Sequence, residues 1–351
     1  MQRISRRQFC LSLAVGAGGA AGVGWLASLP RLRRDTGSGA SAPPAPTAAG
    51  MEVFREESHA FGTKVSLAVL HADRETARRA IAAARAELEL VDQLMSLYRP
   101  DSPLCRLNRC GVLESPHPYL VAVLREAQAV AARTGGAFDV TVQPLWTVFS
   151  EAKKAGGLPK TAAIDAALGR VDWRRVEIAP DRIRLHGSGT ELTLNGIAQG
   201  FAADCVMAAL RRHGIRHALV DAGEIGAIGG KNESEPWKVG IQHPRRPDAY
   251  IEIAKLEGRC LATSGDYATS FGEDFRDHHI FDPRIGRSPE TLSSVTIAAP
   301  TATQADALAT AVFVLGPERG LGLVRSMPEV DAFLVLKDGA TLATEGFPAA
   351  A

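Results

Sequence analysis

The chain has 351 residues, of which 46% are hydrophobic and 23% charged, so it is long enough to bury a substantial core. Lysine and arginine (40) balance aspartate and glutamate (39), which leaves a formal net charge of +1. This balance provides no argument for a nucleic acid or another polyanion as a partner.

Residues 1–34 have the features of a Tat-type, twin-arginine export signal. Arg6 and Arg7 precede an uncharged run, rich in Ala, Gly and Leu, from Cys10 to Leu29. The many glycines make this run only weakly apolar, which favours an export signal and a periplasmic location. The alternative is an uncleaved N-terminal membrane anchor, because about 20 apolar residues can span a bilayer.

Residues 35–50 are rich in Gly, Ser, Ala, Pro and Thr, a composition that predicts a flexible linker. The folded part is expected to cover residues 51–347, as one large domain or two intimate lobes. Its four cysteines match no zinc-site spacing. Free thiols are expected, with a Cys105–Cys110 disulfide as the alternative.

The hydrophobic pattern predicts an irregular alternation of helices and strands. Strands are expected on both sides of residues 61–63 and at residues 138–142, 217–221, 237–242, 295–299 and 332–336. Helices are expected at residues 73–95, 118–134, 201–213 and 305–315. This order favours the α+β class over a doubly wound sheet.

A glycine-rich turn, LNGIAQGFAADC, joins a short apolar run to the helix expected near Gly200. Gly196 and Gly200 allow the backbone to approach a neighbour closely, which suits either a phosphate or a packed helix. The spacing matches neither dinucleotide fingerprint, and no Lys or Arg follows. A packing turn is therefore the preferred interpretation of this stretch alone.

Three further groups of polar residues are candidates for chemistry. Asp139 follows a Gly-Gly break and is expected either to cap or to bind a ligand. His279 and Asp282 are three residues apart at a turn. They could act as a base and its orienting partner, or they could form a hydrogen-bonded structural corner. Asp306 and Thr310 lie one helical turn apart, so their oxygens form a set that suits Mg²⁺ shared with substrate phosphates. The alternative, which the pair by itself favours, is a surface Asp and a Thr that bonds back into its own helix.

The order of these motifs resembles the ApbE family of FAD:protein FMN transferases, over essentially everything after the linker. The matching segments are FGT (61–63), MSLYRPDSPLCRLN (95–108), GGAFDVTVQPLW (135–146), LNGIAQGFAAD (194–204), VDAGEIGAIG (220–229), ATSGDY (262–267), HIFDPRIGR (279–287) and ADALATAVFVLG (305–316). The resemblance implies an ApbE-type, T-fold-like α+β structure, with mixed sheets and packed helices in two intimate lobes.

The glycine turn departs from the family's usual form, which is close to DLGGIAKGYA. Thr193 stands in place of the Asp, Asn195 in place of a Gly and Gln199 in place of the Lys. The form LNGIAQG, together with the export signal, is similar to the NosX-like subgroup linked to nitrous-oxide respiration.

The resemblance also implies the residues of a site. The family's FAD contacts correspond to Phe61, Tyr98, Ala137, Phe138, Asp139, Thr193, Gln199 and Ile280. Its Mg²⁺ ligands correspond to Asp306, Thr310 and the backbone carbonyl of Gly196, while His279 and Asp282 match an HxxDP motif next to the phosphates.

The implied reaction is Mg²⁺-dependent transfer of FMN from FAD to a Thr or Ser hydroxyl of an acceptor flavoprotein, with release of AMP. His279 is the preferred base and Asp282 the second candidate. The expected partner is a flavin-acceptor domain, NosR-like if the narrower resemblance holds. Two alternatives are a periplasmic FAD-binding carrier and an Mg²⁺-dependent FAD pyrophosphatase.

Overall fold

The computed structural model describes residues 23–25 and 50–350, and its largest element is an eight-stranded sheet. Across the sheet the strands are β14 (Thr341–Ala343), β13 (Asp331–Leu336), β12 (Leu292–Ala299), β11 (Cys260–Gly265), β8 (Ile225–Ile228), β7 (His217–Asp221), β3 (Thr63–His71) and β2 (Glu52–Ala60). The expected export signal (1–34) and linker (35–50) lie outside the described residues, apart from 23–25 and Gly50.

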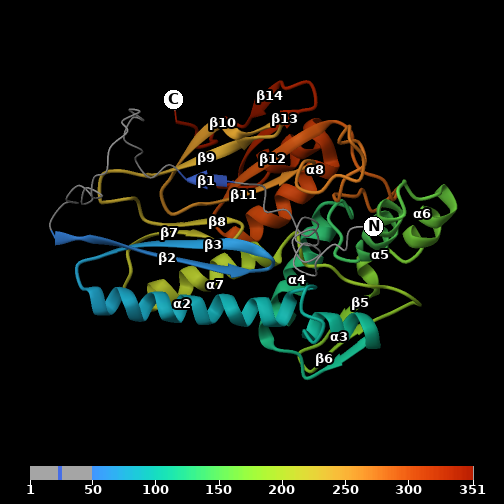
Figure 1. Cartoon of the computed structure of the whole chain (residues 1–351), viewed down its shortest axis with the longest axis horizontal. Helices are drawn as coiled ribbons and strands as arrows, with labels where there is room; N and C mark the ends of the chain where they lie inside the picture. The colour runs from blue at the N-terminus through green and yellow to red at the C-terminus, as the bar shows by residue number, and fades with distance from the viewer. Residues whose placement is uncertain (1–22, 26–49, 351) are drawn as a thin grey trace, which may run out of the picture.

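Both faces of this sheet are covered. Helices α2 (Arg74–Met95), α7 (Ala198–Arg212) and α8 (Ala302–Arg325) pack on one face, and α2 and α7 lie below the strands in Figure 1. A three-stranded sheet of β1 (Val23–Trp25), β9 (Trp237–His243) and β10 (Arg246–Leu256) lies on the other side, where β9 and β10 share an apolar cluster with the large sheet. This double coverage explains why β12 is buried at every position.

A second lobe lies beside the end of the large sheet, at the right of Figure 1. It contains α3 (Pro103–Cys110), β4 (Val112–Glu114), α4 (Pro118–Arg133), α5 (Gln143–Lys154), α6 (Thr161–Leu168), the 3₁₀ turn η2 (Trp173–Arg175), β5 (Val176–Ile178) and β6 (Arg182–Leu185). The main apolar core runs from this lobe into the helices under the large sheet. The two lobes therefore share one core.

The α+β class predicted from the sequence is confirmed, but the strand predicted at residues 138–142 is wrong. These residues form turns that lead into α5. Asp139 Oδ1 accepts hydrogen bonds from the backbone N–H of Thr141 at 2.8 Å and from its hydroxyl at 2.6 Å, and this local bonding curls the chain.

The expected mixture of strand directions is not found in the described sheets, where every ladder is antiparallel. Several neighbouring strands, such as β2–β3 and β7–β8, are joined by short turns, which can connect only antiparallel strands. The four cysteines from Cys105 to Cys260 are free thiols, as expected.

The Phe61-Gly62-Thr63 motif is the turn of the β2–β3 hairpin. Phe61 has φ = 52° and Gly62 has φ = 75°, the left-handed pair that a two-residue type I′ turn requires. The backbone N–H of Phe61 donates to Asp92 Oδ1 of α2 at 2.8 Å. This bond ties the hairpin to the helix beneath it.

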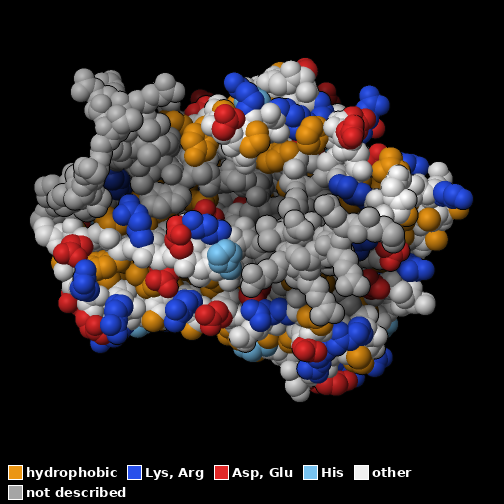
Figure 2. Space-filling view, in the orientation of Figure 1, with side chains coloured by type: hydrophobic (Ala, Val, Ile, Leu, Met, Phe, Trp, Pro, Cys, Tyr) orange, Lys and Arg blue, Asp and Glu red, His pale blue; other side chains and the backbone are white. Residues whose placement is uncertain are grey.

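Acidic and basic side chains are interspersed over the visible face of the molecule, as Figure 2 shows. Several of them form exposed ion pairs, such as Arg85–Glu89 on α2 and Lys64–Glu57 on the β2–β3 hairpin. Pairs of this kind contribute little to stability. The mixed pattern agrees with the net charge of +1.

Helix α8 is the one candidate membrane span that length and apolar composition give among the described residues. Its most apolar window is 56% buried inside the protein. Gly316, with φ = 76°, and Pro317 break the helix into two segments. The burial and the break are those of a core helix.

Gly200 allows α7 and α8 to meet closely. A Cβ at this position would lie 2.2 Å from the Ala302 carbonyl oxygen and 2.8 Å from the Cβ of Asp306. The backbone N–H of Gly200 also donates to Asp306 Oδ2 at 3.0 Å. Any side chain at Gly200 would push α8, and Asp306 with it, away from the turn.

Replacement of this glycine should therefore destabilise the fold. Gly200→Ala is expected to lower the free energy of unfolding by about 1–3 kcal/mol, the usual cost of overpacking. Gly322→Ala is the matched control, because a Cβ on this α8 glycine would meet nothing within 4 Å. The control should gain about 0.5–1 kcal/mol from helix propensity. Urea unfolding measures both, and equal effects would contradict the packing argument.

Candidate functional site

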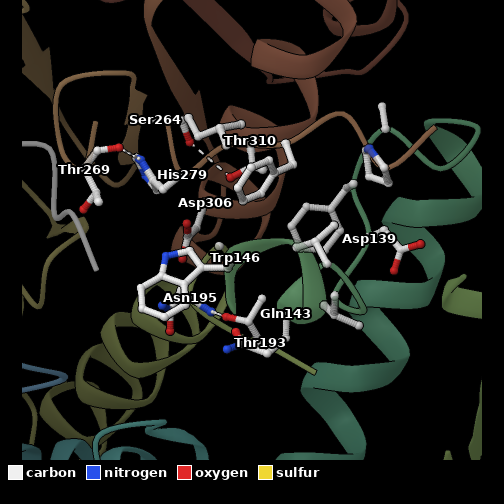
Figure 3. Close-up of a pocket in the computed structure, with 18 of the residues that line it drawn as sticks. Asp139, Gln143, Trp146, Thr193, Asn195, Ser264, Thr269, His279, Asp306 and Thr310 are labelled. Carbon is white, nitrogen blue, oxygen red and sulfur yellow. Dashed lines mark hydrogen bonds between the residues drawn. The ribbon is translucent and has the colours of Figure 1, made fainter. Parts of the chain in front are cut away.

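A pocket lies where both lobes meet the first half of α8 (Figure 3). Its walls come from the turn before α7, the end of β11, residues 137–142 before α5, and the loop of residues 266–283. The structure brings together most of the residues expected from the sequence: Ala137, Phe138, Asp139, Thr193, Gly196, His279, Ile280, Asp306 and Thr310.

The glycine turn presses the chain against α8. A Cβ on Gly196 would lie 3.0 Å from the hydroxyl oxygen of Thr310 and 3.3 Å from the ring of Phe138. The Thr310 hydroxyl also lies 3.1 Å from the hydroxyl oxygen of Ser264 on β11. The missing side chain thus lets the turn backbone reach the hydroxyl groups at this end of the pocket.

Besides Asp139, two buried carboxyl groups line the pocket, Asp306 and Glu224, and each of these two residues is only 4% exposed. Asp306 Oδ2 accepts the Gly200 N–H, and Glu224 Oε2 accepts the backbone N–H of Thr263 at 3.2 Å. Burial raises the pKa of both groups, and the charge of Asp306 raises the pKa of Glu224 further.

The donor atoms of this region fit a hard cation. They are carboxylate, hydroxyl and carbonyl oxygens, which are the ligands that Mg²⁺ prefers. The residues that the structure describes contain no cluster of three or more His, Cys, Asp or Glu side chains. The expected set of Asp306, Thr310 and the Gly196 carbonyl has a single carboxylate. It therefore suits a cation that takes its remaining ligands from a substrate phosphate and water.

His279 lines the pocket, and the backbone holds one of its ring nitrogens. Its Nδ1 lies 3.2 Å from the backbone carbonyl oxygen of Thr269, which can only accept, so the proton is assigned to Nδ1. Nε2 then keeps its lone pair. Burial lowers the pKa of His279, so the imidazole is neutral at physiological pH. A neutral imidazole with a free lone pair is the form that a general base requires.

His278, by contrast, has both ring nitrogens engaged within the fold. Nε2 donates to the Pro289 carbonyl oxygen at 3.0 Å, and Nδ1 accepts the Ile280 N–H at 3.3 Å. The ring packs edge-on against Phe313 of α8. Burial lowers the pKa of His278 to about 3. This histidine therefore fixes the loop and has no lone pair left for a substrate.

Asp282 lies outside the pocket lining, and both of its carboxylate oxygens bind Arg284. Oδ1 is 2.7 Å from Arg284 Nε, Oδ2 is 2.6 Å from Nη2, and Oδ1 also accepts the Arg284 N–H at 2.9 Å. These contacts hold the turn that follows Phe281. The geometry gives no support to the base role expected of Asp282.

Asp139 is likewise occupied by the backbone. Besides the Thr141 contacts at Oδ1, its Oδ2 accepts the Trp173 N–H at 2.9 Å. In Figure 3 its carboxylate lies apart from the His279, Thr310 and Asp306 side chains. Its carboxylate thus ties the turn before α5 to the start of η2, and its expected ligand role stays a prediction.

Known proteins share this architecture, and residues 61–334 match the ApbE family. The chain belongs to the ApbE family. The FAD:protein FMN transferase of Treponema pallidum is 34% identical over 286 residues, which cover 74% of this chain and 77% of that protein. The protein of the same name from Salmonella typhimurium is 32% identical over 305 residues, with coverages of 83% and 85%.

Solved ApbE structures superpose on most of the chain. The ApbE protein of Thermotoga maritima gives a TM-score of 0.75 at 29% identity and covers 84% of this chain and 97% of its own. The flavinyl transferase ApbE of Pseudomonas stutzeri gives 0.74 at 29% identity, with coverages of 86% and 97%.

Three of the FAD contacts expected from the ApbE resemblance do not line this pocket. Phe61 lies in the hairpin turn, and Tyr98 packs against Gly62 and lines a separate surface hollow near Arg99. Gln199 is buried on α7 and packs against Gly223. A Cβ added to Gly223 would lie 2.2 Å from the Gln199 amide nitrogen. Their flavin contacts stay predictions.

The sequence reasoning missed other pocket residues of this ApbE fold. Trp146 and Gln143 on α5, together with Glu224, Ser264 and Thr269, were not assigned any role, although all of them line the pocket. Gln143 and Trp146 are spaced i and i+3, which places them on one face of a helix. This spacing could have indicated that both side chains face the same way, but only if a helix had been predicted to begin at Gln143, where α5 begins.

The neutral state of His278 predicts acid sensitivity. An unfolded histidine binds a proton below pH 6.5, whereas His278 in the fold does so only near pH 3, so its contribution to stability is lost as the pH falls below 6.5. Because of this group, the free energy of unfolding should fall by about 2 kcal/mol when the pH is lowered from 7 to 5.

Comparison with His278→Gln isolates this effect, because glutamine can also accept the Ile280 N–H and donate to the Pro289 carbonyl. The difference in unfolding free energy between wild type and variant, measured by urea unfolding at both pH values, should shrink by about 2 kcal/mol on acidification. Parallel pH profiles would show that His278 is not neutral in the fold.

Proposed function

We propose that this chain is an Mg²⁺-dependent FAD:protein FMN transferase, which moves FMN from FAD to a Thr or Ser hydroxyl of an acceptor flavoprotein and releases AMP. Membership of the ApbE family and the printed names of its relatives support a flavin transferase. The observation that carries the mechanism is the neutral His279, which lines the same pocket as Asp306 and Thr310 and is held by the backbone through Nδ1, so that Nε2 keeps its lone pair.

In the proposed reaction the acceptor oxygen attacks the phosphorus that bears riboflavin. A new P–O bond forms as the pyrophosphate bond breaks, AMP leaves, and the hydroxyl proton passes to Nε2 of His279. A Mg²⁺ ion held by Asp306, Thr310 and the Gly196 carbonyl would supply positive charge to the pyrophosphate oxygens. Because Thr269 fixes the imidazole, the lone pair is oriented before the acceptor arrives.

The apolar wall of the pocket suits the flavin end of FAD. Ala137, Phe138 and Ile280 are buried and line the cavity, and Thr193, Gln143 and Trp146, which lie close together in Figure 3, line it as well. An aromatic ring such as that of Trp146 can stack on a planar heterocycle, and the amide of Gln143 can hydrogen-bond to its edge. The remaining predicted contacts, Phe61, Tyr98 and Gln199, rest on the family resemblance.

The test measures single-turnover FMN transfer from FAD, in the presence of Mg²⁺, to a recombinant NosR-like acceptor domain, read by the mass of the acceptor. His279→Ala should slow transfer by roughly 10²- to 10⁴-fold, the usual contribution of a positioned base. FAD affinity should change far less, because the imidazole is assigned to the reacting hydroxyl and not to the flavin.

Asp282→Asn is the control, since it removes the Arg284 ion pair and leaves His279 in place. It should lower the thermal midpoint while keeping the transfer rate of the folded protein within about tenfold. Full activity of His279→Ala would overturn the base assignment. Release of FMN and AMP by the wild type without a modified acceptor would indicate a pyrophosphatase, and FAD binding without turnover would indicate a carrier.

We also propose that the protein works in the periplasm after Tat export, with a NosR-like acceptor. The support is the twin arginine before the apolar run and the LNGIAQG form of the glycine turn. An uncleaved N-terminus would add membrane association.

Replacement of both Arg6 and Arg7 by Lys should leave the folded protein in the cytoplasm, because the Tat machinery reads this pair. Fractionation followed by immunoblotting measures the location. Unchanged export of the double variant would argue for another secretion route or an anchor.

A further inference from the structure

Glu224 occupies a position that the expected ligand set does not include. It precedes β8 directly, at the end of the short turn after β7, and its side chain lines the pocket with Asp306. Only 4% of the residue is exposed, so the carboxyl group is removed from bulk water. One of its oxygens, Oε2, accepts the Thr263 N–H at 3.2 Å.

Another buried acid of this protein, Asp266, is neutralised by cations of the chain itself. Asp266, with no exposed surface, binds Arg245 through both oxygens at 2.7 Å and also accepts from Lys337. For Glu224 and Asp306, which line the same pocket, no Lys or Arg within residues 50–350 forms an ion pair. Two buried carboxyl groups that face each other's charge need a cation from outside the chain to be ionised together.

Glu224 is also connected to the hydroxyl ligands through β11. Its hydrogen bond holds the backbone at Thr263, and the next residue, Ser264, places its hydroxyl 3.1 Å from that of Thr310. Glu224 thus adds a negative charge beside Asp306 and fixes the strand that supports Thr310.

We propose that Glu224 is a further carboxylate of the divalent-cation site, which increases its affinity for Mg²⁺ as a ligand or as a partner of the bound ion's water. This inference rests on the proposed Mg²⁺-dependent function. It extends the ligand set of Asp306, Thr310 and the Gly196 carbonyl by a residue from the β7–β8 turn.

The test is Mg²⁺ binding by the full chain, measured by titration calorimetry with and without FAD. Glu224→Gln removes the charge but keeps an oxygen that can accept the Thr263 N–H. We expect the affinity for Mg²⁺ to fall roughly 10- to 100-fold, as for the loss of a supporting carboxylate at other metal sites. The thermal midpoint without Mg²⁺ should stay the same or rise, and the Mg²⁺-induced increase should shrink.

Asp221→Asn is the matched control, because this carboxylate ends β7 on the other side of the same turn and does not line the pocket. It should bind Mg²⁺ as the wild type does. Glu224→Asp keeps the charge on a shorter side chain and should recover part of the affinity that Glu224→Gln loses.

Asp306→Asn separates failure of this inference from failure of the proposed function. If Asp306→Asn loses Mg²⁺ binding and Glu224→Gln binds it as the wild type does, Glu224 is not part of the site and the proposed function stands. A lower midpoint of Glu224→Gln at every Mg²⁺ concentration, with unchanged affinity, would also overturn the inference, since it indicates a purely structural role. If the wild type binds no Mg²⁺ with or without FAD, the metal in the proposed function and this inference fail together.

Discussion

The close contact between α7 and α8 at Gly200 is the constraint on which the pocket depends. The missing side chain lets the backbone of α7 reach the Ala302 carbonyl, and the Gly200 N–H binds Asp306. One contact thus packs two core helices and sets the position of a carboxylate. Four residues earlier, Gly196 approaches Thr310 in the same way. The glycine turn shapes the site because the absence of side chains at Gly196 and Gly200 lets its backbone approach α8 closely.

The buried acids of this protein differ in whether a basic side chain neutralises them. Asp266 is neutralised by Arg245 and Lys337, and this cluster anchors the start of the loop that carries His279. Asp306 and Glu224 are buried without such partners among the described residues, which is unfavourable unless the site receives a cation. Unfavourable burial of this kind is common at functional sites, because the missing interaction is supplied by the ligand.

The two adjacent histidines, His278 and His279, differ in how many of their ring nitrogens are hydrogen-bonded within the fold. Within the described part of the chain, His278 has a partner on each ring nitrogen, and His279 has one on Nδ1 alone. Both have a lowered pKa because both are removed from water. The difference between their proposed roles therefore rests on the contacts of the second nitrogen and not on the residue type or the degree of burial.

The sequence by itself determined the α+β class, most long helices and the set of motifs, because helical periodicity and turn residues are local signals that survive in any context. It also placed Asp306 and Thr310 on one helical face and predicted that His279 belongs to the same site. Only the tertiary structure decided that Asp282 and Asp139 are held by the backbone and Arg284, and that Glu224 and Trp146 enter the pocket. The entry of Glu224 and Trp146 depends on contacts between segments far apart in the chain, such as β8 with β11 or α5 with the loop of residues 266–283. Asp282 and Asp139 are held largely by partners two residues away, but the local sequence does not record whether a polar side chain will bind such a neighbour or face a pocket.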